Sequence, residues 1–137
     1  MSASREGLDP VFAQKLAVFE KKLSEHGIKV LFTQGYRSIG EQNKLYAKGR
    51  TSPGSIVTNA KGGYSWHNFG LGADYAFIVN GKVTWNGPWG TFGKIAKECG
   101  LEWGGDWKKF KDRPHVQLTG GKTLAQMRSA AIAKKKP

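Results

Sequence analysis

The sequence predicts a single small α+β domain, in which helices pack on a central antiparallel sheet. Segments with helical and strand-like periodicity are mixed along 137 residues, a length that suits one domain. Asn80-Gly81 predicts a tight hairpin, which pairs its two strands antiparallel. Hydrophobic residues make up 39% of the chain, and a domain of this size buries roughly two-thirds of the surface that the unfolded chain exposes.

The first helix is predicted from Pro10 towards Gly27. Asp9 is a suitable N-cap, proline is favoured at the first helical position, and glycine commonly ends a helix. The helix buries one apolar face, made by residues spaced four, three and four apart: Phe12, Leu16, Phe19 and Leu23.

A strand, a short helix and a long loop follow. Residues 28–33 are mostly apolar and predict a strand. Ser38 and Glu41 have the spacing of a capping box, which opens a short helix towards Lys48. Residues 49–64 are rich in Gly, Ser, Thr, Pro and Asn and predict an ordered loop, and loops of that length are often functional.

The remaining elements are short. The sequence predicts strands at 72–79 and 82–85, a helix at 92–98 that Gly100 ends, strands at 101–103 and 115–118, and a weak helix at 123–136.

Charge points to an anionic partner. Twenty-two Lys and Arg against ten Asp and Glu give a net charge of +12, which suits nucleic acid, an acidic membrane surface or an acidic cell wall. The basic residues are scattered and show no zinc-finger or RNP-like pattern, so specific nucleic-acid binding is disfavoured. We expect a domain over residues 1–120 and a basic tail over 121–137, whose lysines at 134–136 assist contact with anionic envelope polymers.

Cysteine count and apolar runs exclude several classes. A single cysteine, Cys99, excludes a disulfide framework and a multi-cysteine zinc site. No apolar run approaches the roughly 20 residues of a membrane span. The first residues lack the apolar region of a secretion signal, so synthesis in the cytoplasm is expected.

Three residues are candidate metal ligands: His67, Asp74 and His115. Two imidazoles and a carboxylate suit a catalytic zinc ion, which keeps one position for water. Gly70 and Gly72 permit a tight bend between the first two ligands. Such a set also occurs by chance in many proteins, so spacing alone leaves both interpretations open.

Three charged residues are candidates to assist that metal. Asp112, three residues before His115, suits a general base, and Arg37 suits a cation for a developing oxyanion. Both also fit ordinary surface charges. Asp106 is expected either to hydrogen-bond a ligand histidine or to occupy a turn, with the former favoured.

Residues 65–74, SWHNFGLGAD, resemble the S-x-H-x-x-G-x-A-x-D signature of the D-Ala-D-Ala carboxypeptidase-type zinc peptidases. Residues 112–115, DRPH, resemble the second motif of that family. The stretches at 34–38, 49–60 and 103–107 resemble the branch of L-alanyl-D-glutamate endopeptidases, to which phage endolysins belong. The resemblance spans about residues 8–118, and Gly72 departs from it where the signature has alanine.

The resemblance implies the fold shared by these peptidases and the hedgehog domain. It makes His67, Asp74 and His115 zinc ligands. It also makes Asp112 the general base and Arg37 a substrate- or transition-state-binding cation. Ser65 is implied to neighbour the substrate, and Trp66, inside the same motif, is a candidate substrate contact.

The function expected from these observations is zinc-dependent cleavage of the L-Ala–D-Glu bond in peptidoglycan stem peptides. A monomeric phage endolysin that reaches the wall through a holin pore fits the expected lack of a secretion signal. Within the family the alternative is a D-Ala-D-Ala carboxypeptidase, and from another class it is a non-catalytic basic binding module. Asp112 together with Arg37 disfavours the binding module.

Overall fold

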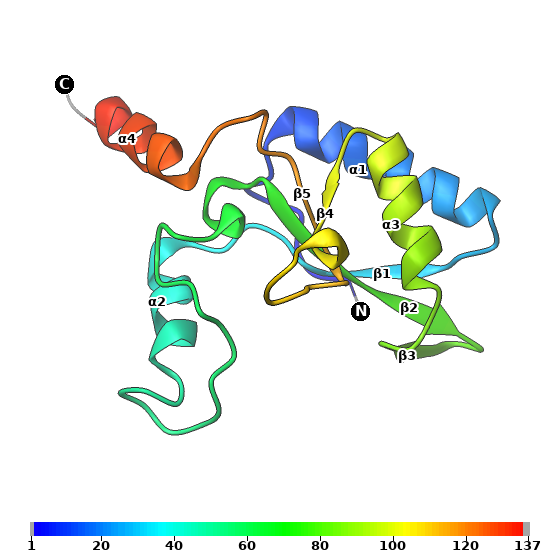
Figure 1. The fold of residues 1–137 in the computed structure, drawn as a ribbon, viewed down its shortest axis with the longest axis horizontal. Coiled ribbons are helices and arrows are strands. Elements are labelled where there is room, and N and C mark those ends of the chain that lie inside the picture. Colours follow the sequence, from blue (N-terminus) through cyan, green and yellow to red (C-terminus); the bar gives the residue numbers. More distant parts are fainter. Residues whose placement is uncertain (1, 136–137) are drawn as a thin grey trace.

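The computed structural model describes residues 2–135, and side chains up to residue 133. It confirms the predicted α+β class (Figure 1). Within the described residues the helices are α1 (Pro10–Glu25), α2 (Ile39–Ala47), α3 (Trp89–Glu98) and α4 (Leu124–Lys135). The strands are β1 (Val30–Gln34), β2 (Gly72–Val79), β3 (Lys82–Thr84), β4 (Glu102–Trp103) and β5 (His115–Gln117), and two 3-10 turns are η1 (Trp66–Phe69) and η2 (Gly104–Asp106).

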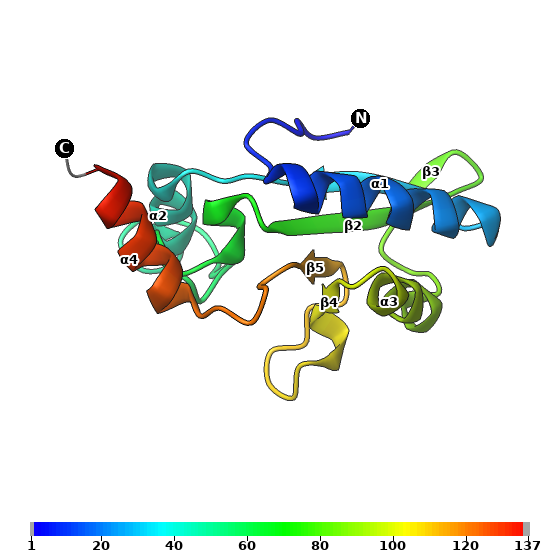
Figure 2. The same cartoon turned by 90° about the horizontal axis from the view of Figure 1, so that it is seen from above.

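The strands form one antiparallel sheet in the order β1-β2-β5-β4, with β3 paired to the far half of β2. β2 is the central strand, and its first residues lie between β1 and β5 (Figure 2). Asp74 is opposite His115 in the register of β2 and β5. The pairing therefore brings together two residues that are 41 positions apart in the chain.

The core lies where α1 and α3 pack on the sheet. The four apolar residues predicted to face inward from α1 are all fully buried. Phe19 stacks edge-on against Tyr75 of β2 at 5.7 Å and against Phe92 of α3 at 5.0 Å, measured between ring centroids. These contacts hold β2, and with it the residues at its start, in a fixed position.

Local signals form as the sequence predicts. The Asp9 carboxylate accepts hydrogen bonds from two backbone amides in the first turn of α1. Ser38 and Glu41 form both halves of the capping box of α2. Asn80 and Gly81 have φ of 52° and 75°, as a two-residue hairpin turn requires.

The predicted start of α3 is wrong by one turn. α3 begins at Trp89 rather than Phe92, although its N-cap position makes no side-chain hydrogen bond. The Trp89 ring lies 4.2 Å from Phe77 and 5.1 Å from Phe92. Burial of this ring favours the additional turn, and tertiary packing of that kind leaves no local sequence signal.

Residues 49–64 form the expected loop, which α2 and α4 support. The buried Gln42 of α2 donates to the backbone oxygen of Ala60 at 2.7 Å. Arg128 of α4 donates to the oxygen of Gly63 at 3.1 Å and stacks over Tyr64 at 3.8 Å. The tail predicted over 121–137 thus contains a helix that contacts the end of this loop, just before the motif at residues 65–74 (the histidine motif).

The lysines at 134–136 are predicted to contact anionic envelope polymers. Lys136 lies outside the described residues, as do the side chains at 134 and 135. Among the helices of residues 2–135, none combines the length and apolar character needed to cross a membrane.

Candidate metal and catalytic site

His67, Asp74 and His115 come from three elements and meet at one point. η1 supplies His67, β2 supplies Asp74 and β5 supplies His115. One donor atom from each lies within 4.8 Å of the other two. Asp74 Oδ1 is 3.3 Å from His67 Nε2 and 2.9 Å from His115 Nδ1. Both histidines are buried and the carboxylate is half-buried.

Two glycines make this approach possible. Gly70 has φ of +70°, and a Cβ there would lie 2.2 Å from the backbone oxygen of Gly7. A Cβ at Gly72 would lie 3.0 Å from Cε1 of the His115 ring and 3.0 Å from the backbone nitrogen of His67. The start of β2 therefore passes directly beside the His115 imidazole and the backbone of His67.

The outer nitrogen of each imidazole is held by an acceptor. His67 Nδ1 lies 2.8 Å from the backbone oxygen of Gly35. His115 Nε2 lies 2.8 Å from Gln117 Oε1. Because a carbonyl oxygen only accepts, these contacts place an N–H on each outer nitrogen, and the inner nitrogens, His67 Nε2 and His115 Nδ1, both face Asp74.

Gln117 is a site residue that the sequence analysis missed. Its amide also contacts Glu102 at 3.4 Å, and Glu102 accepts hydrogen bonds from Thr119. Gln117 lies two positions after His115 in β5, and residues at that spacing share one face of a strand. This periodicity is the signal that could have identified it.

The charges at the site are mutually dependent. Burial acts to raise the pKa of Asp74, but hydrogen bonds from His115 and His67 outweigh it and hold that pKa below its ordinary range. Burial acts to lower the pKa of His115, but the hydrogen bond and charge of Asp74 outweigh it and raise that pKa above 6.5.

Asp112 is half-buried in the loop before β5. Its backbone N–H donates to Gly104 at 3.0 Å, and its carbonyl accepts from the His115 amide at 3.2 Å. Burial raises the pKa of Asp112, and the negative charge of Asp74 raises it further, whereas the two histidines lower it. A carboxylate with a raised pKa is suited to accept and return a proton.

Arg37 lies between β1 and α2 and is partly buried. Its guanidinium donates to Gln42 at 2.8 Å and to Gln34 at 3.2 Å. Burial lowers its pKa, while the charge of Asp74 opposes that change, and arginine remains a cation in either case. The Arg37 backbone N–H donates to the oxygen of His67 at 3.0 Å, which ties it to the histidine motif.

Ser65 and Trp66 flank His67 on η1. The Ser65 hydroxyl accepts from the His67 amide at 3.2 Å and caps this turn. Trp66 is half-buried. Both residues lie beside His67, and their contacts with substrate stay predictions.

The favoured role of Asp106 is wrong. Its carboxylate pairs with Lys97 of α3 at 2.9 Å, and within the described residues it makes no hydrogen bond to a histidine. Asp106 belongs to the turn η2, which is the alternative that the sequence left open. Gly35 and Gln117 hold the histidines instead.

Trp107 ends the stretch 103–107 that carries part of the family resemblance, and the structure places it beside His115. Its ring lies 5.4 Å from that of His115, tilted by 50°, and 36% of the residue is exposed. It therefore offers an accessible aromatic edge directly beside the candidate ligand.

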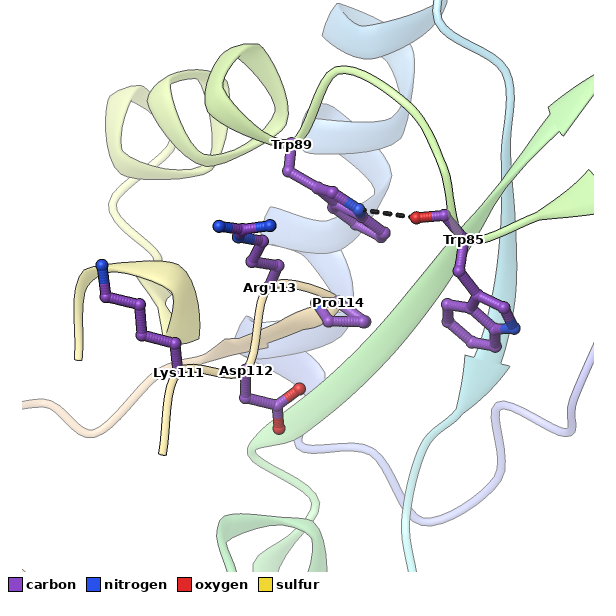
Figure 3. Close-up of a pocket in the computed structure, with 6 residues that line it drawn as sticks. All are labelled: Trp85, Trp89, Lys111, Asp112, Arg113 and Pro114. Atoms are coloured by element: carbon purple, nitrogen blue, oxygen red, sulfur yellow. Dashed lines mark hydrogen bonds between the residues drawn. The ribbon is translucent and has the colours of Figure 1, made fainter. Parts of the chain in front are cut away.

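Asp112 also lines a pocket of about 340 Å³, whose lining includes none of the three candidate ligands. Figure 3 shows Lys111, Arg113 and Pro114 on the same loop, with Trp85 and Trp89 across from them. Trp89 Nε1 donates to the backbone oxygen of Trp85 at 2.8 Å. The pocket thus combines two cations, two indoles and a carboxylate.

Comparisons with known proteins agree on one family. Residues 58–118 match the family described as D-alanyl-D-alanine carboxypeptidase. The chain is 43% identical over 122 residues to the peptidoglycan L-alanyl-D-glutamate endopeptidase CwlK of Bacillus subtilis (strain 168), covering 81% of this chain and 73% of that protein. It is 39% identical over 58 residues to the L-alanyl-D-glutamate peptidase of Listeria phage A118, covering 39% of this chain and 21% of that one.

Solved structures share the fold. The L-Ala D-Glu endopeptidase ChiX of Serratia marcescens is 27% identical with a TM-score of 0.59, over 84% of this chain and 83% of that one. The vancomycin resistance D,D-pentapeptidase VanY, in a complex with Zn(II), has a TM-score of 0.65 at 15% identity, over 94% of this chain and 83% of that one.

Proposed function

Because this chain belongs to the M15 family of peptidases, we propose that it is a zinc-dependent endopeptidase that cleaves the L-Ala–D-Glu bond of peptidoglycan stem peptides. The observation that carries the proposal is the convergence of His67, Asp74 and His115 within 4.8 Å, beside a carboxylate with a raised pKa. The bond specificity is supported by the names of CwlK, ChiX and the phage peptidase.

The donor set fits zinc. Ligand atoms about 2.0–2.2 Å from a tetrahedral ion lie roughly 3.3 Å from one another. The donor atoms of His67 and His115 lie 3.3 Å and 2.9 Å from Asp74 Oδ1, close to that spacing. The lone pairs of both imidazoles face the same point because their outer nitrogens are engaged.

The chain's own residues divide the chemistry between them. A bound zinc ion supplies a Lewis acid that polarises the scissile carbonyl and acidifies water. Asp112 takes the proton from the attacking water and later returns it to the leaving amine. Arg37 balances the negative charge that develops on the carbonyl oxygen, and Ser65 and Trp66 border the bound peptide.

Two alternatives are less well supported. A D-Ala-D-Ala carboxypeptidase fits the description of the matched family, but the relatives at 43% and 27% identity are named as L-Ala–D-Glu endopeptidases. A non-catalytic binding module needs no proton acceptor, so it gives no reason for the raised pKa of the Asp112 carboxylate near the candidate ligands.

We further propose that the protein is a phage endolysin, which reaches the wall through a holin pore and acts there as a monomer. The named phage relative supports this role. The net charge of +12 favours contact with anionic envelope polymers.

Digestion of purified peptidoglycan tests the proposed activity. We expect new L-Ala carboxyl ends and free D-Glu amino ends by mass spectrometry, abolished by a chelator and restored by zinc. Release of single D-Ala would instead assign the carboxypeptidase. Absence of any product from folded, zinc-loaded protein would overturn the hydrolase.

A further inference from the structure

We propose that residues 3–9, which precede α1, form an arm that positions His67 for metal binding, and that Arg5 is the positioning residue that anchors this arm. The inference rests on the proposed zinc site. It assigns a role to a segment that lies well before the residues matched to the family, 58–118.

The arm contacts the backbone that orients the His67 ring. The Ala3 N–H donates to the Phe32 oxygen at 2.9 Å, which places the arm along the outer edge of β1. At the buried Gly35, a Cβ would lie 3.2 Å from the Ser4 oxygen and 2.7 Å from the Phe32 ring. Gly35 thus packs between the arm and Phe32, and its oxygen is the acceptor that lies 2.8 Å from His67 Nδ1.

The arm also contacts the turn that carries His67. Gly70 ends η1, and its oxygen accepts a hydrogen bond from the Asp9 N–H at 2.9 Å. A Cβ at Gly70 would lie 2.2 Å from the Gly7 oxygen, so the arm and the turn pack backbone against backbone. The arm therefore contacts both segments that fix His67, one at the acceptor of its ring and the other at the end of its turn.

Arg5 fastens the arm to the core of the domain. Its guanidinium donates to both oxygens of Glu20 in α1, at 2.8 Å and 3.0 Å, and lies 4.5 Å from the centroid of the Phe32 ring. The buried Tyr75 of β2 donates to the same carboxylate at 2.5 Å. Paired arginine–carboxylate bonds fix geometry as well as charge. Arg5 thus joins the arm to α1, to β1 and to the residue that follows Asp74 in β2.

Loss of Arg5 should loosen the arm without removing a metal ligand. Ordering the arm costs conformational entropy, and within the described residues Arg5 makes the only ion pair between the arm and the rest of the chain. The Gly35 oxygen is a backbone atom, so it is displaced through the segments that pack on it. A looser arm therefore gives His67 more freedom relative to Asp74.

The test compares Arg5→Gln with a matched control, Lys97→Gln. Lys97 also pairs with a carboxylate, that of Asp106 at 2.9 Å, and its ammonium lies 5.8 Å from the Trp103 ring. Each variant therefore loses one partly exposed ion pair and one contact between a cation and an aromatic ring. Thermal unfolding of both proteins sets a working temperature at which each is folded.

Hydrogen exchange of backbone amides, followed by NMR in the metal-free protein, is the first measurement. The Asp9 amide donates to Gly70 and the Arg37 amide donates to His67. We expect both amides to exchange roughly tenfold faster in Arg5→Gln than in the unchanged protein, because their opening follows that of the arm. The same amides should exchange at the unchanged rate in Lys97→Gln.

Zinc affinity, from competition with a chromogenic chelator, is the second measurement. We expect Arg5→Gln to bind zinc about tenfold more weakly, as residues that support a metal ligand typically do when replaced, and Lys97→Gln to bind it as the unchanged protein does. Arg5→Lys keeps the charge but not the paired hydrogen bonds, so it should recover part of the affinity. It also provides the comparison in place of Arg5→Gln where that variant fails to fold.

Two results would overturn the role of the arm: amide exchange and zinc affinity unchanged by the loss of Arg5, or an equal change in Lys97→Gln. Failure of the unchanged protein to bind zinc would instead overturn the proposed function. The exchange measurement separates the two cases, because it is made without metal and reports the contacts of the arm with the backbone of the histidine motif.

Discussion

Each histidine of the candidate site depends on a second residue for its orientation. Gly35 holds His67 through a backbone oxygen, and Gln117 holds His115 through a side chain. The two arrangements differ in how far mutation can test them, because a backbone acceptor survives substitution and a side-chain acceptor does not. Gln117 is therefore the residue at which the orientation of a ligand can be changed without removing the ligand.

We predict that Gln117→Met weakens zinc binding by about 10- to 100-fold, because His115 loses the acceptor that fixes its protonated nitrogen. Methionine is of similar length, so the buried position stays filled. Competition with a chromogenic chelator measures the affinity. Gln14→Met, at an exposed position of α1, is the control, and equal affinity in both variants would contradict the role of Gln117.

We predict that Asp112→Asn lowers kcat by at least about 100-fold while zinc content stays at that of the unchanged protein, because the proton acceptor is lost and no ligand is. Asp106→Asn is the matched control, since Asp106 pairs with Lys97 at the surface and should retain activity. Peptide hydrolysis and metal analysis are measured on the same samples. Loss of zinc in Asp112→Asn would make it a ligand instead.

Zinc affinity should depend on pH because zinc and a proton compete for His115. The pKa of His115 in the metal-free protein is raised above 6.5 by Asp74. Below that raised pKa we expect the apparent affinity to fall about tenfold per pH unit, and above it to level off. Calorimetric titrations between pH 5.5 and 8.5 measure this, and a constant affinity across the range would contradict it.

At the scale of elements, the loop between β4 and β5 determines where Asp112 lies. The Gly104 oxygen accepts from the Asp112 amide at 3.0 Å. A Cβ at Gly104 would lie 2.2 Å from the Asp112 oxygen, which is backbone and has no freedom to rotate away. The turn η2 and the Asp112 segment therefore fit together only with glycine at 104.

We predict that Gly104→Ala destabilises the protein by roughly 1–3 kcal/mol and lowers activity further than stability accounts for, because Asp112 is displaced. Gly90→Ala provides the opposite case. A Cβ at Gly90 meets nothing within 4 Å, and alanine in helix α3 should stabilise by up to about 1 kcal/mol. Urea unfolding with parallel assays separates the two, and equal stability of both variants would contradict the steric argument.

At the scale of the whole molecule, the candidate ligands join three separate parts of the fold. His67 precedes β2, Asp74 lies within it, and His115 begins β5. A metal ion bound by all three links the histidine motif to two neighbouring strands. Folding and metal binding should therefore be coupled, since the unfolded chain does not hold these donors together.

We predict that chelation lowers the thermal unfolding midpoint by several degrees and that zinc restores it, with a shift that grows with free zinc concentration. The control is His67→Ala, which lacks one candidate ligand, and zinc should shift its unfolding midpoint little. Differential scanning calorimetry at several zinc concentrations measures the effect. A midpoint that is independent of zinc in the unchanged protein would mean that the ion does not bind the native state.

The sequence by itself determined the elements and the candidate ligands. Asp9, the Ser38–Glu41 capping box and Asn80-Gly81 act through neighbours a few residues away, so their patterns can be read locally. The histidine motif was identifiable because its residues recur together in a known family.

Only the tertiary structure decided which residues serve those ligands. The start of α3 at Trp89, the pairing of Asp106 with Lys97 and the contacts of Gln117 and Trp107 with His115 all depend on segments that are distant in the chain. Packing and strand register select such partners from many side chains of suitable chemistry, because a buried polar atom bonds whichever group the fold brings within reach.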